Sequence, residues 1–244
     1  MDGEVDPVLR VAVILPDLLG TYGDGGNAAV LAARARARGI EVEVVPLTIG
    51  TTITPADLYL LGGGEDGPQR LACDLLVEGG FVERVHDGAH VFAVCAGLQI
   101  LGTTFSIEGD ASYPGLGLVE ATTTRARARA VGDMATMVSG HMMVGFENHG
   151  GVTTLGPGVE PFGQVLVGRG NDGHVDGYRV GPIWATYAHG PVLAQNPWLA
   201  DQLLSEVTGE TLAPWASVAD RLYLERCERV STRRSAGDHT AGRH

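Results

Sequence analysis

The first hundred residues alternate short apolar runs with longer segments of helical character, and this alternation constrains the fold more than any other feature. The apolar runs are residues 11–15, 42–46, 58–61 and 91–94, and the helical segments are residues 28–38, 70–85 and 98–102. Short buried strands that alternate with helices are typical of a parallel sheet with crossover helices. The sequence therefore predicts an α/β fold with a flavodoxin-like, three-layer core.

The second half of the chain has a different pattern. Residues 115–187 are rich in glycine and threonine and contain short β-prone pieces, which predict antiparallel strands joined by long loops. Asn196 and Pro197 then predict the start of a helix to about residue 207, and residues 217–229 predict a last helix. We expect one domain over residues 8–230 and a disordered tail over residues 231–244, because the tail is polar and basic.

The composition excludes several classes of function. The 244 residues are 44% hydrophobic, enough for a full core, and a formal net charge of -12 repels nucleic-acid phosphates and anionic lipid. The acidic start has no signal-peptide core after it, and no apolar run reaches ~18 residues. We therefore expect a cytoplasmic protein without membrane insertion. Cys73, Cys95 and Cys227 lack C-x-x-C spacing, which argues against a disulfide framework and a thiolate metal site.

Cys95 lies where an apolar run meets the start of a helix. Residues 91–94 lead into it and residues 96–102 lead out of it, which predicts a sharp strand-to-helix elbow with the thiol pointing to solvent. Helix N–H groups behind the sulfur would lower the pKa of the thiol, and a nearby histidine would complete a nucleophile able to attack a carbonyl carbon. The alternative is a small buried cysteine that ends a core strand.

Two glycine-rich segments mimic nucleotide-binding fingerprints. Residues 23–28 match G-x-G-x-x-A, but they begin too far after the first strand for the tight turn that seats a pyrophosphate. Residues 62–67 match G-x-G-x-x-G directly after a strand, yet Glu65 and Asp66 would put carboxylates where the phosphate lies. We interpret residues 62–64 as a turn whose backbone N–H groups form an oxyanion hole for the reaction of Cys95. The alternative is an ordinary flexible loop.

Eight histidines are candidates for a general base. His189 follows an apolar run and precedes a glycine, so on parallel strands it shares the rim of the sheet with Cys95 and is the best candidate. The alternative is a surface histidine or a satisfied core histidine. We expect His149, among glycines and polar residues, to organise a loop by hydrogen bonds. Four others flank a loop or lie in the tail, and we expect them to be solvated: His86, His90, His239 and His244.

Four segments of the sequence, which include the glycine turn and the Cys95 elbow, resemble a known family. The segments LYLLGGGED (58–66), CAGLQ (95–99), GFENHGG (145–151) and TYAHGP (186–191) resemble, in this order, class I glutamine amidotransferase domains of the cobyric-acid-synthase-like branch. Within that branch, LPDLLGTYGDGGN (15–27) resembles the opening of the GatD-type glutaminase subunits of lipid II isoglutaminyl synthases. The resemblance spans residues 10–229, and five motifs in one order are more specific than any one alone.

The resemblance implies a role for each residue that matches a motif. Cys95 would be the nucleophile and His189 the general base. Arg127 is a rival to Arg129 as the family's arginine, because residues 124–130 align ambiguously. The other implied contacts to the bound glutamine come from the oxyanion-hole amides of Gly64 and Ala96 and from the side chains of Gln99, Arg129 and Asn148.

The resemblance also implies a partner. In this family L-glutamine is hydrolysed to glutamate, and the ammonia passes to a MurT-type, Mur-ligase-like subunit that uses ATP to activate the D-glutamate α-carboxyl of the lipid II stem peptide. We expect no metal or organic cofactor in this chain, since ATP and Mg²⁺ would belong to the partner. One alternative is an amidotransferase of corrinoid (cobyric acid) synthesis, although this chain has no P-loop. The other is a non-catalytic regulatory module with this fold.

Two positions depart from the family pattern. Ala93 stands where many thiol amidotransferases have a glycine, so the elbow must form without that glycine's freedom. Pro191 stands where the usual His-x-Glu has its glutamate, so the acid that orients His189 is missing from this motif. The resemblance suggests that an acid of the partner takes its place. The alternative is a carboxylate elsewhere in this chain, such as Glu147.

Overall fold

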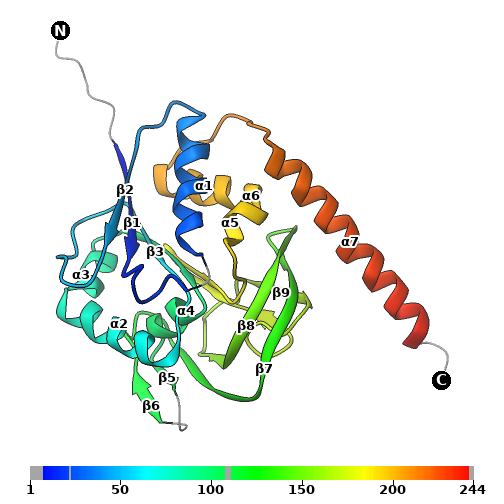
Figure 1. The fold of residues 1–244 in the computed structure, drawn as a ribbon, viewed down its shortest axis with the longest axis horizontal. Coiled ribbons are helices and arrows are strands. Elements are labelled where there is room, and N and C mark those ends of the chain that lie inside the picture. Colours follow the sequence, from blue (N-terminus) through cyan, green and yellow to red (C-terminus); the bar gives the residue numbers. More distant parts are fainter. Residues whose placement is uncertain (1–7, 22, 108–110, 242–244) are drawn as a thin grey trace.

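A six-stranded sheet forms the centre of the computed structural model, which describes residues 8–21, 23–107 and 111–241 (Figure 1). The strands lie in the order β11 (Tyr178–Val180), β12 (Ile183–Thr186), β4 (His90–Val94), β3 (Leu58–Leu61), β1 (Leu9–Ile14) and β2 (Val42–Leu47). All neighbouring strands are parallel except β11 and β12. The predicted parallel sheet is confirmed, with one antiparallel strand added at its edge.

Helices cover the sheet on both faces. On one side α1 (Gly25–Arg36) packs with α5 (Val192–Gln195) and α6 (Pro197–Thr208), and across the strands lie α2 (Asp66–Glu78) and α3 (Phe81–His86) (Figure 1). The short helix α4 (Ala96–Leu101) follows β4 directly. All four residues of β3 are buried, as expected for a central strand covered on both sides. This is the predicted three-layer core.

A long hairpin dominates the second half of the chain. The strands β7 (Ala121–Val138) and β8 (His141–Leu155) are joined by Ser139 and Gly140, which have φ values of 48° and 82°. Positive φ at both residues of a two-residue turn matches the twist of the flanking strands. The strands β5 (Thr104–Ser106), β6 (Ser112–Pro114), β9 (Gly163–Val167) and β10 (Val175–Asp176) complete this second sheet in the order β10-β9-β7-β5-β6.

The hairpin is longer than the sequence indicated. Antiparallel strands were predicted in this half, but residues 125–155 form two long strands where we expected mainly loops. Residues 125–130 alternate arginine with alanine, a residue that is depleted in strands, and residues 145–151 contain three glycines, which weaken a strand. The local preference for a strand is therefore weak in these segments, and the hydrogen-bonded ladder between β7 and β8 holds both strands in place.

Helix α7 (Val218–Ala241) extends away from the rest of the molecule (Figure 1). The sequence predicted a last helix to residue 229 and a disordered tail from residue 231, whereas the structure continues the helix to Ala241. The hydroxyls of Ser231 and Thr232 donate hydrogen bonds to carbonyl oxygens one turn earlier, so these polar residues continue the helix instead of ending it. Residues 242–244 lie outside the described residues. In the described ranges, no helix combines the length and apolarity needed to cross a membrane.

Gly97 allows α4 to pack directly on β3. A Cβ atom at this position would lie 2.7 Å from the Cβ of Leu61 and 3.0 Å from its carbonyl oxygen. We predict that Gly97→Ala lowers the free energy of unfolding by about 1–3 kcal/mol, because α4 must move off the strand. Chemical denaturation measures this change. Gly67→Ala is the control, since Gly67 also lies in a helix with nothing within 4 Å of its Cβ position. Equal stability of both variants would contradict the close packing of α4.

Candidate active site

Cys95 occupies a strained elbow between β4 and α4. Its backbone has φ 51° and ψ -103°, outside the regions that residues with side chains favour. The Cys95 N–H donates to the carbonyl of Thr186 at 3.0 Å, and its own carbonyl accepts from the N–H of Gln99 at 3.0 Å. Hydrogen bonds to a neighbouring strand and to the following helix thus keep the Cys95 backbone in this strained conformation. Ala93 is an ordinary buried strand residue, so the unusual conformation falls on Cys95 itself.

The Cys95 thiol is buried, and the prediction that it points to solvent is wrong. The residue is 6% exposed, and burial raises the pKa of the thiol to about 12, with the Asp24 carboxylate adding to the rise. A hydrogen bond from the Ala96 N–H and the charge of Arg129 act in the opposite direction but are weaker. The expected low pKa is therefore also wrong for the resting chain. Helix α4 has six residues, and its N-terminus does not outweigh the loss of water.

The pairing of two parallel strands puts His189 at the edge of the sheet where Cys95 lies. Thr186, at the end of β12, lies beside Val94, at the end of β4, so the residues after both strands meet at one edge of the sheet, as predicted. His189 is fully buried and lines none of the cavity described below. Its backbone N–H donates to the carbonyl of Phe146 at 2.7 Å, and the two rings stack with centroids 5.5 Å apart.

The protonation of His189 follows from its contacts. Its Nδ1 lies 2.7 Å from the carbonyl oxygen of Tyr187. A carbonyl oxygen only accepts hydrogen bonds, so Nδ1 carries the proton and Nε2 is the nitrogen that can accept another. Burial lowers the pKa of His189 to about 4, although the hydrogen bond with Tyr187 acts to raise it. The imidazole is therefore neutral near pH 7 and able to act as a base.

The glycine loop after β3 reaches the same edge of the sheet. The N–H of Gly63 donates to Oδ2 of Asp24 at 2.8 Å, and the carbonyl of Gly62 accepts from the backbone of α4 at 3.2 Å. Asp24 belongs to the glycine-rich segment at the start of α1, which thus supports this loop. Gly64 and Cys95 line the same cavity, an arrangement that suits the oxyanion hole predicted from the loop.

A cavity of about 210 Å³ opens beside Cys95. Most of the groups predicted to contact a substrate line this cavity, namely Gly64, Gln99, Arg129 and Asn148. The rival arginine, Arg127, lines it as well. Its volume suits a small polar molecule. Among the described residues, no group of three or more His, Cys, Asp or Glu side chains is arranged to hold a metal ion.

A bulge in β7 carries the arginines of the cavity. Arg125 pairs with Gly151 and Ala130 pairs with His149, so residues 126–129 lie opposite the single residue Gly150. Bulges of this kind redirect side chains next to functional sites. The structure thus puts both Arg127 and Arg129 at the cavity.

Arg129 makes the closer contact of the two with a predicted site residue. Its Nε donates to Oδ1 of Asn148 at 2.6 Å, and its Nη2 donates to the carbonyl of Asn148 at 3.1 Å. These two hydrogen bonds hold the guanidinium in one orientation. The structure therefore brings Arg129 and Asn148 together, while Arg127 lines the cavity from the same bulge.

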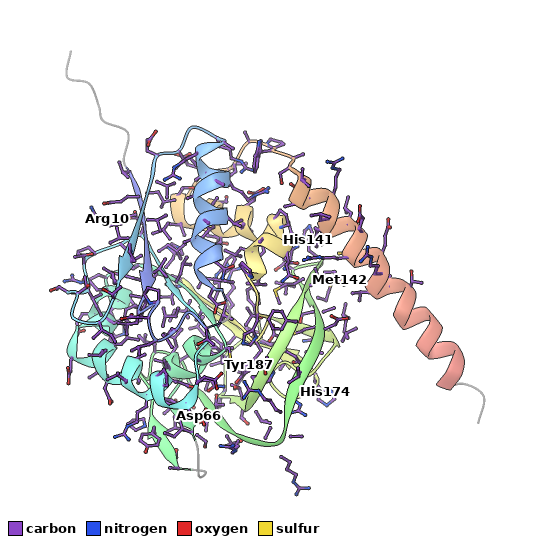
Figure 2. The ribbon with its side chains drawn as sticks, viewed as in Figure 1. Arg10, Asp66, His141, Met142, His174 and Tyr187 are labelled. Carbon is purple, nitrogen blue, oxygen red and sulfur yellow. The ribbon has the colours of Figure 1, made fainter. Side chains whose placement is uncertain are left out.

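Gln99 belongs to a buried polar network that the sequence analysis missed. Its Oε1 accepts from Nε2 of Gln69 at 2.9 Å, and its Nε2 donates to the hydroxyl of Tyr187 at 3.1 Å. Figure 2 shows Tyr187 near the centre of the molecule, and its hydroxyl is 2.7 Å from Oγ1 of Thr153 on β8. Its place at the end of an apolar strand was the available signal. Gln69 gave no comparable signal, because it lies within a helix.

Glu147 and His149 form a second network next to the cavity. Oε1 of Glu147 accepts from the N–H of Arg169 at 2.8 Å, and Oε2 accepts from the N–H of Gly170 at 3.0 Å. Oε2 also lies 3.2 Å from Nε2 of His149, whose Nδ1 lies 3.1 Å from the carbonyl of Gly151. Burial acts to raise the pKa of Glu147, but these hydrogen bonds outweigh it and lower the pKa. The contacts agree with the loop-organising role predicted for His149, and they direct Glu147 to His149.

The histidines expected to be solvated are only partly so. His86 is exposed, whereas His90 is half-buried and burial lowers its pKa. The side chains of His239 and His244 lie outside the described residues.

The comparisons with known proteins agree with this geometry. The model of the CobB/CobQ-like glutamine amidotransferase domain matches residues 10–197. The chain is 33% identical over 205 residues to the lipid II isoglutaminyl synthase (glutamine-hydrolyzing) subunit GatD of Staphylococcus aureus, covering 81% of this chain and 84% of that protein. It is 30% identical to the GatD subunit of Streptococcus pneumoniae, covering 84% of this chain and 82% of that protein.

A solved structure gives independent support for the fold. A crystal structure of a glutamine amidotransferase, 22% identical in sequence, superposes with a TM-score of 0.54 and covers 82% of this chain and 99% of that one. The six-stranded sheet with its flanking helices and second sheet is thus the fold of these enzymes.

We predict that the Cys95 thiol reacts slowly with iodoacetamide at neutral pH, because burial raises its pKa to about 12. Its thiolate fraction at pH 7 is roughly 10³ times smaller than that of a solvated cysteine. The rate should rise throughout the range from pH 7 to pH 10. Mass spectrometry of the Cys95 peptide measures it without interference from Cys73 and Cys227. Fast alkylation that is already constant above pH 7 would show a thiolate in the resting chain.

Proposed function

The chain belongs to the CobB/CobQ-like glutamine amidotransferase domain family, and from this premise we propose that it is the glutaminase subunit of a lipid II isoglutaminyl synthase. One observation carries the proposal: the strained Cys95 elbow and His189 lie at the ends of adjacent parallel strands. The similarity to two GatD subunits over more than four fifths of each chain supports the choice of substrate. A thiol, an imidazole and backbone amides are the groups that acyl transfer requires.

The proposed reaction begins with the transfer of the Cys95 proton to Nε2 of His189. The sulfur attacks the carboxamide carbon of glutamine, and the N–H groups of Gly64 and Ala96 hold the oxygen that becomes negative. Because the resting thiol has a raised pKa and the resting imidazole a lowered one, the proton moves as the carbon–sulfur bond forms. A separated ion pair in the empty site would lack water to stabilise it.

The second half of the reaction releases ammonia and then glutamate. The carbon–nitrogen bond breaks as His189 returns the proton to the leaving nitrogen, which departs as ammonia and leaves a thioester on Cys95. Water, deprotonated by His189, then attacks the thioester, so that glutamate leaves and the thiol is restored. This chain needs no metal or organic cofactor for these steps.

The ammonia would be used by a second subunit. We infer a MurT-type, Mur-ligase-like partner in the cytoplasm that holds ATP and Mg²⁺ and amidates the D-glutamate α-carboxyl of lipid II. A carboxylate that the partner brings close to the site would raise the pKa of the imidazole and favour proton uptake, whichever acid orients the ring. Hydrolysis of glutamine would then be coupled to the presence of the ligase.

We predict that Cys95→Ala abolishes glutamine-dependent amidation by the reconstituted complex, because no thioester forms without the sulfur. Amidation from ammonium salts should persist, since the ligase receives ammonia directly. Product formation is followed by mass spectrometry of the stem peptide. Cys73→Ala is the control, since this buried thiol lies on α2 away from the elbow, and it should keep both activities. Glutamine-dependent turnover in the Cys95→Ala complex would falsify the assignment.

We predict that Arg129→Ala raises the KM for glutamine at least tenfold with a smaller change in kcat, because a charged hydrogen bond to the substrate contributes roughly 1.5–3 kcal/mol. Arg127→Ala removes the same charge from the same bulge without a contact to Asn148, and it should change KM about twofold or less. Steady-state glutamate release measures both variants. A larger effect for Arg127 would exchange the two assignments.

A further inference from the structure

A buried carboxylate, Asp176, is connected to His189 by a continuous series of hydrogen bonds. The first bond runs from Nδ1 of His189 to the carbonyl oxygen of Tyr187, at 2.7 Å. This carbonyl belongs to the peptide group between Tyr187 and Ala188. The imidazole therefore donates to a peptide group, in a chain where Pro191 replaces the glutamate of the usual His-x-Glu.

The same peptide group is held from its other side. The N–H of Ala188 donates to Oγ1 of Thr186 at 3.0 Å, and that hydroxyl donates to Oδ2 of Asp176 at 2.5 Å. Oδ1 of Asp176 also accepts from the N–H of Tyr187 at 2.9 Å. Every donor in the series points from the imidazole toward the carboxylate. A series with one direction polarises cooperatively, each bond strengthening the next.

The series is shielded from water along its whole length. Asp176, Thr186, Tyr187, Ala188 and His189 are all completely buried. Burial raises the pKa of Asp176 to about 6, while hydrogen bonds from Thr186 and Tyr187 lower it, so the carboxylate is mostly ionised at neutral pH. A buried negative charge in a medium of low dielectric acts strongly on groups that are hydrogen-bonded to it.

The backbone around Asp176 is shaped to hold the carboxylate under β12. Gly177 has φ 56°, and a Cβ atom there would overlap the carbonyl oxygen of Ala185. The side chain of Asn171 bonds both backbone groups of Gly177, at 2.7 Å and 2.8 Å. Only a residue without a side chain allows this approach, and it is what brings Asp176 beneath Thr186.

We propose that Asp176 is the orienting acid of His189 and acts at one remove, through the hydroxyl of Thr186 and the peptide group between Tyr187 and Ala188. It is a positioning residue. The series fixes the Nδ1–H tautomer, which leaves Nε2 to take the Cys95 proton. When the ring gains that proton, the polarised series stabilises the positive charge. The proposal rests on the proposed glutaminase reaction for its kinetic consequences only.

The kinetic test uses substitutions at both ends of the series. Asp176→Asn removes the charge, and Thr186→Val removes the hydroxyl that links the peptide group to the carboxylate. Each should lower kcat for glutamate release by the complex roughly 10- to 100-fold with little change in KM, as removal of supporting groups does at other sites. Thr186→Ser keeps the hydroxyl and should retain kcat within about threefold of the wild type.

Asp57→Asn is the matched control. Oδ2 of Asp57 also accepts a backbone N–H, that of Arg10 at 2.7 Å, but at the opposite end of the sheet. This variant should hydrolyse glutamine at the wild-type rate. Thermal unfolding of each variant confirms that it is folded. If Asp176→Asn fails to fold, the comparison of Thr186→Val with Thr186→Ser decides the kinetic arm.

The second measurement reports the tautomer of His189 directly. ¹⁵N NMR of the full chain labelled at histidine should show a protonated Nδ1 in the wild type, and a mixture of tautomers in Asp176→Asn and Thr186→Val. Folded variants with wild-type kcat and an unchanged His189 spectrum would overturn the proposal. A wild-type chain that releases no glutamate would contradict the proposed function instead, and the NMR arm would still decide the role of Asp176.

Discussion

The hydrogen bond from the Cys95 N–H to the carbonyl of Thr186 is the interaction on which the arrangement of the site depends. It extends the parallel pairing of β4 and β12 by one step beyond the strands themselves. Parallel strands end at the same edge of a sheet, so the turn after one strand and the turn after the other must meet. Thr186 also joins the elbow to Asp176 through its hydroxyl, so one residue contacts both halves of the proposed catalytic unit.

Burial determines the electrostatic state of this site. It keeps the Cys95 thiol protonated and the imidazole of His189 neutral, so the resting site contains no thiolate–imidazolium pair. Ions without water or partners are costly in a protein interior. In the proposed reaction charge develops only during turnover, close to the backbone N–H groups of the glycine loop and to an imidazole that is linked to a buried carboxylate. Groups fixed in this way need little reorganisation when the charge appears.

The parts that could be predicted from the sequence depend on short-range patterns. The alternation of strands and helices, the elbow at Cys95 and the place of His189 all follow from residues that adjoin each other in the chain. The burial of Cys95 could not be predicted, because it results from the packing of distant segments around the elbow. The length of β7 and β8 could not be predicted for a related reason, since the alanines and glycines in these segments favour strands only weakly and the two strands depend on pairing with each other.

The role of Asp176 lies beyond sequence reasoning altogether. Its link to His189 passes through a backbone carbonyl, which any residue would supply, and its position depends on the positive φ of Gly177. No spacing between an acidic residue and a histidine in the sequence indicates such a series of hydrogen bonds.

The bulge in β7 separates the shape of the cavity entrance from the pairing of the strands that carry it. Residues 126–129 lie opposite a single residue of β8, and the register between β7 and β8 shifts only across this bulge. Residues of this segment can therefore be substituted, inserted or deleted without a change in how the flanking parts of the strands pair. Natural variation, or a designer, can reshape the entrance of the cavity while the core and the elbow remain as they are. The selectivity of the cavity for the molecule that enters it can therefore change while the fold stays the same.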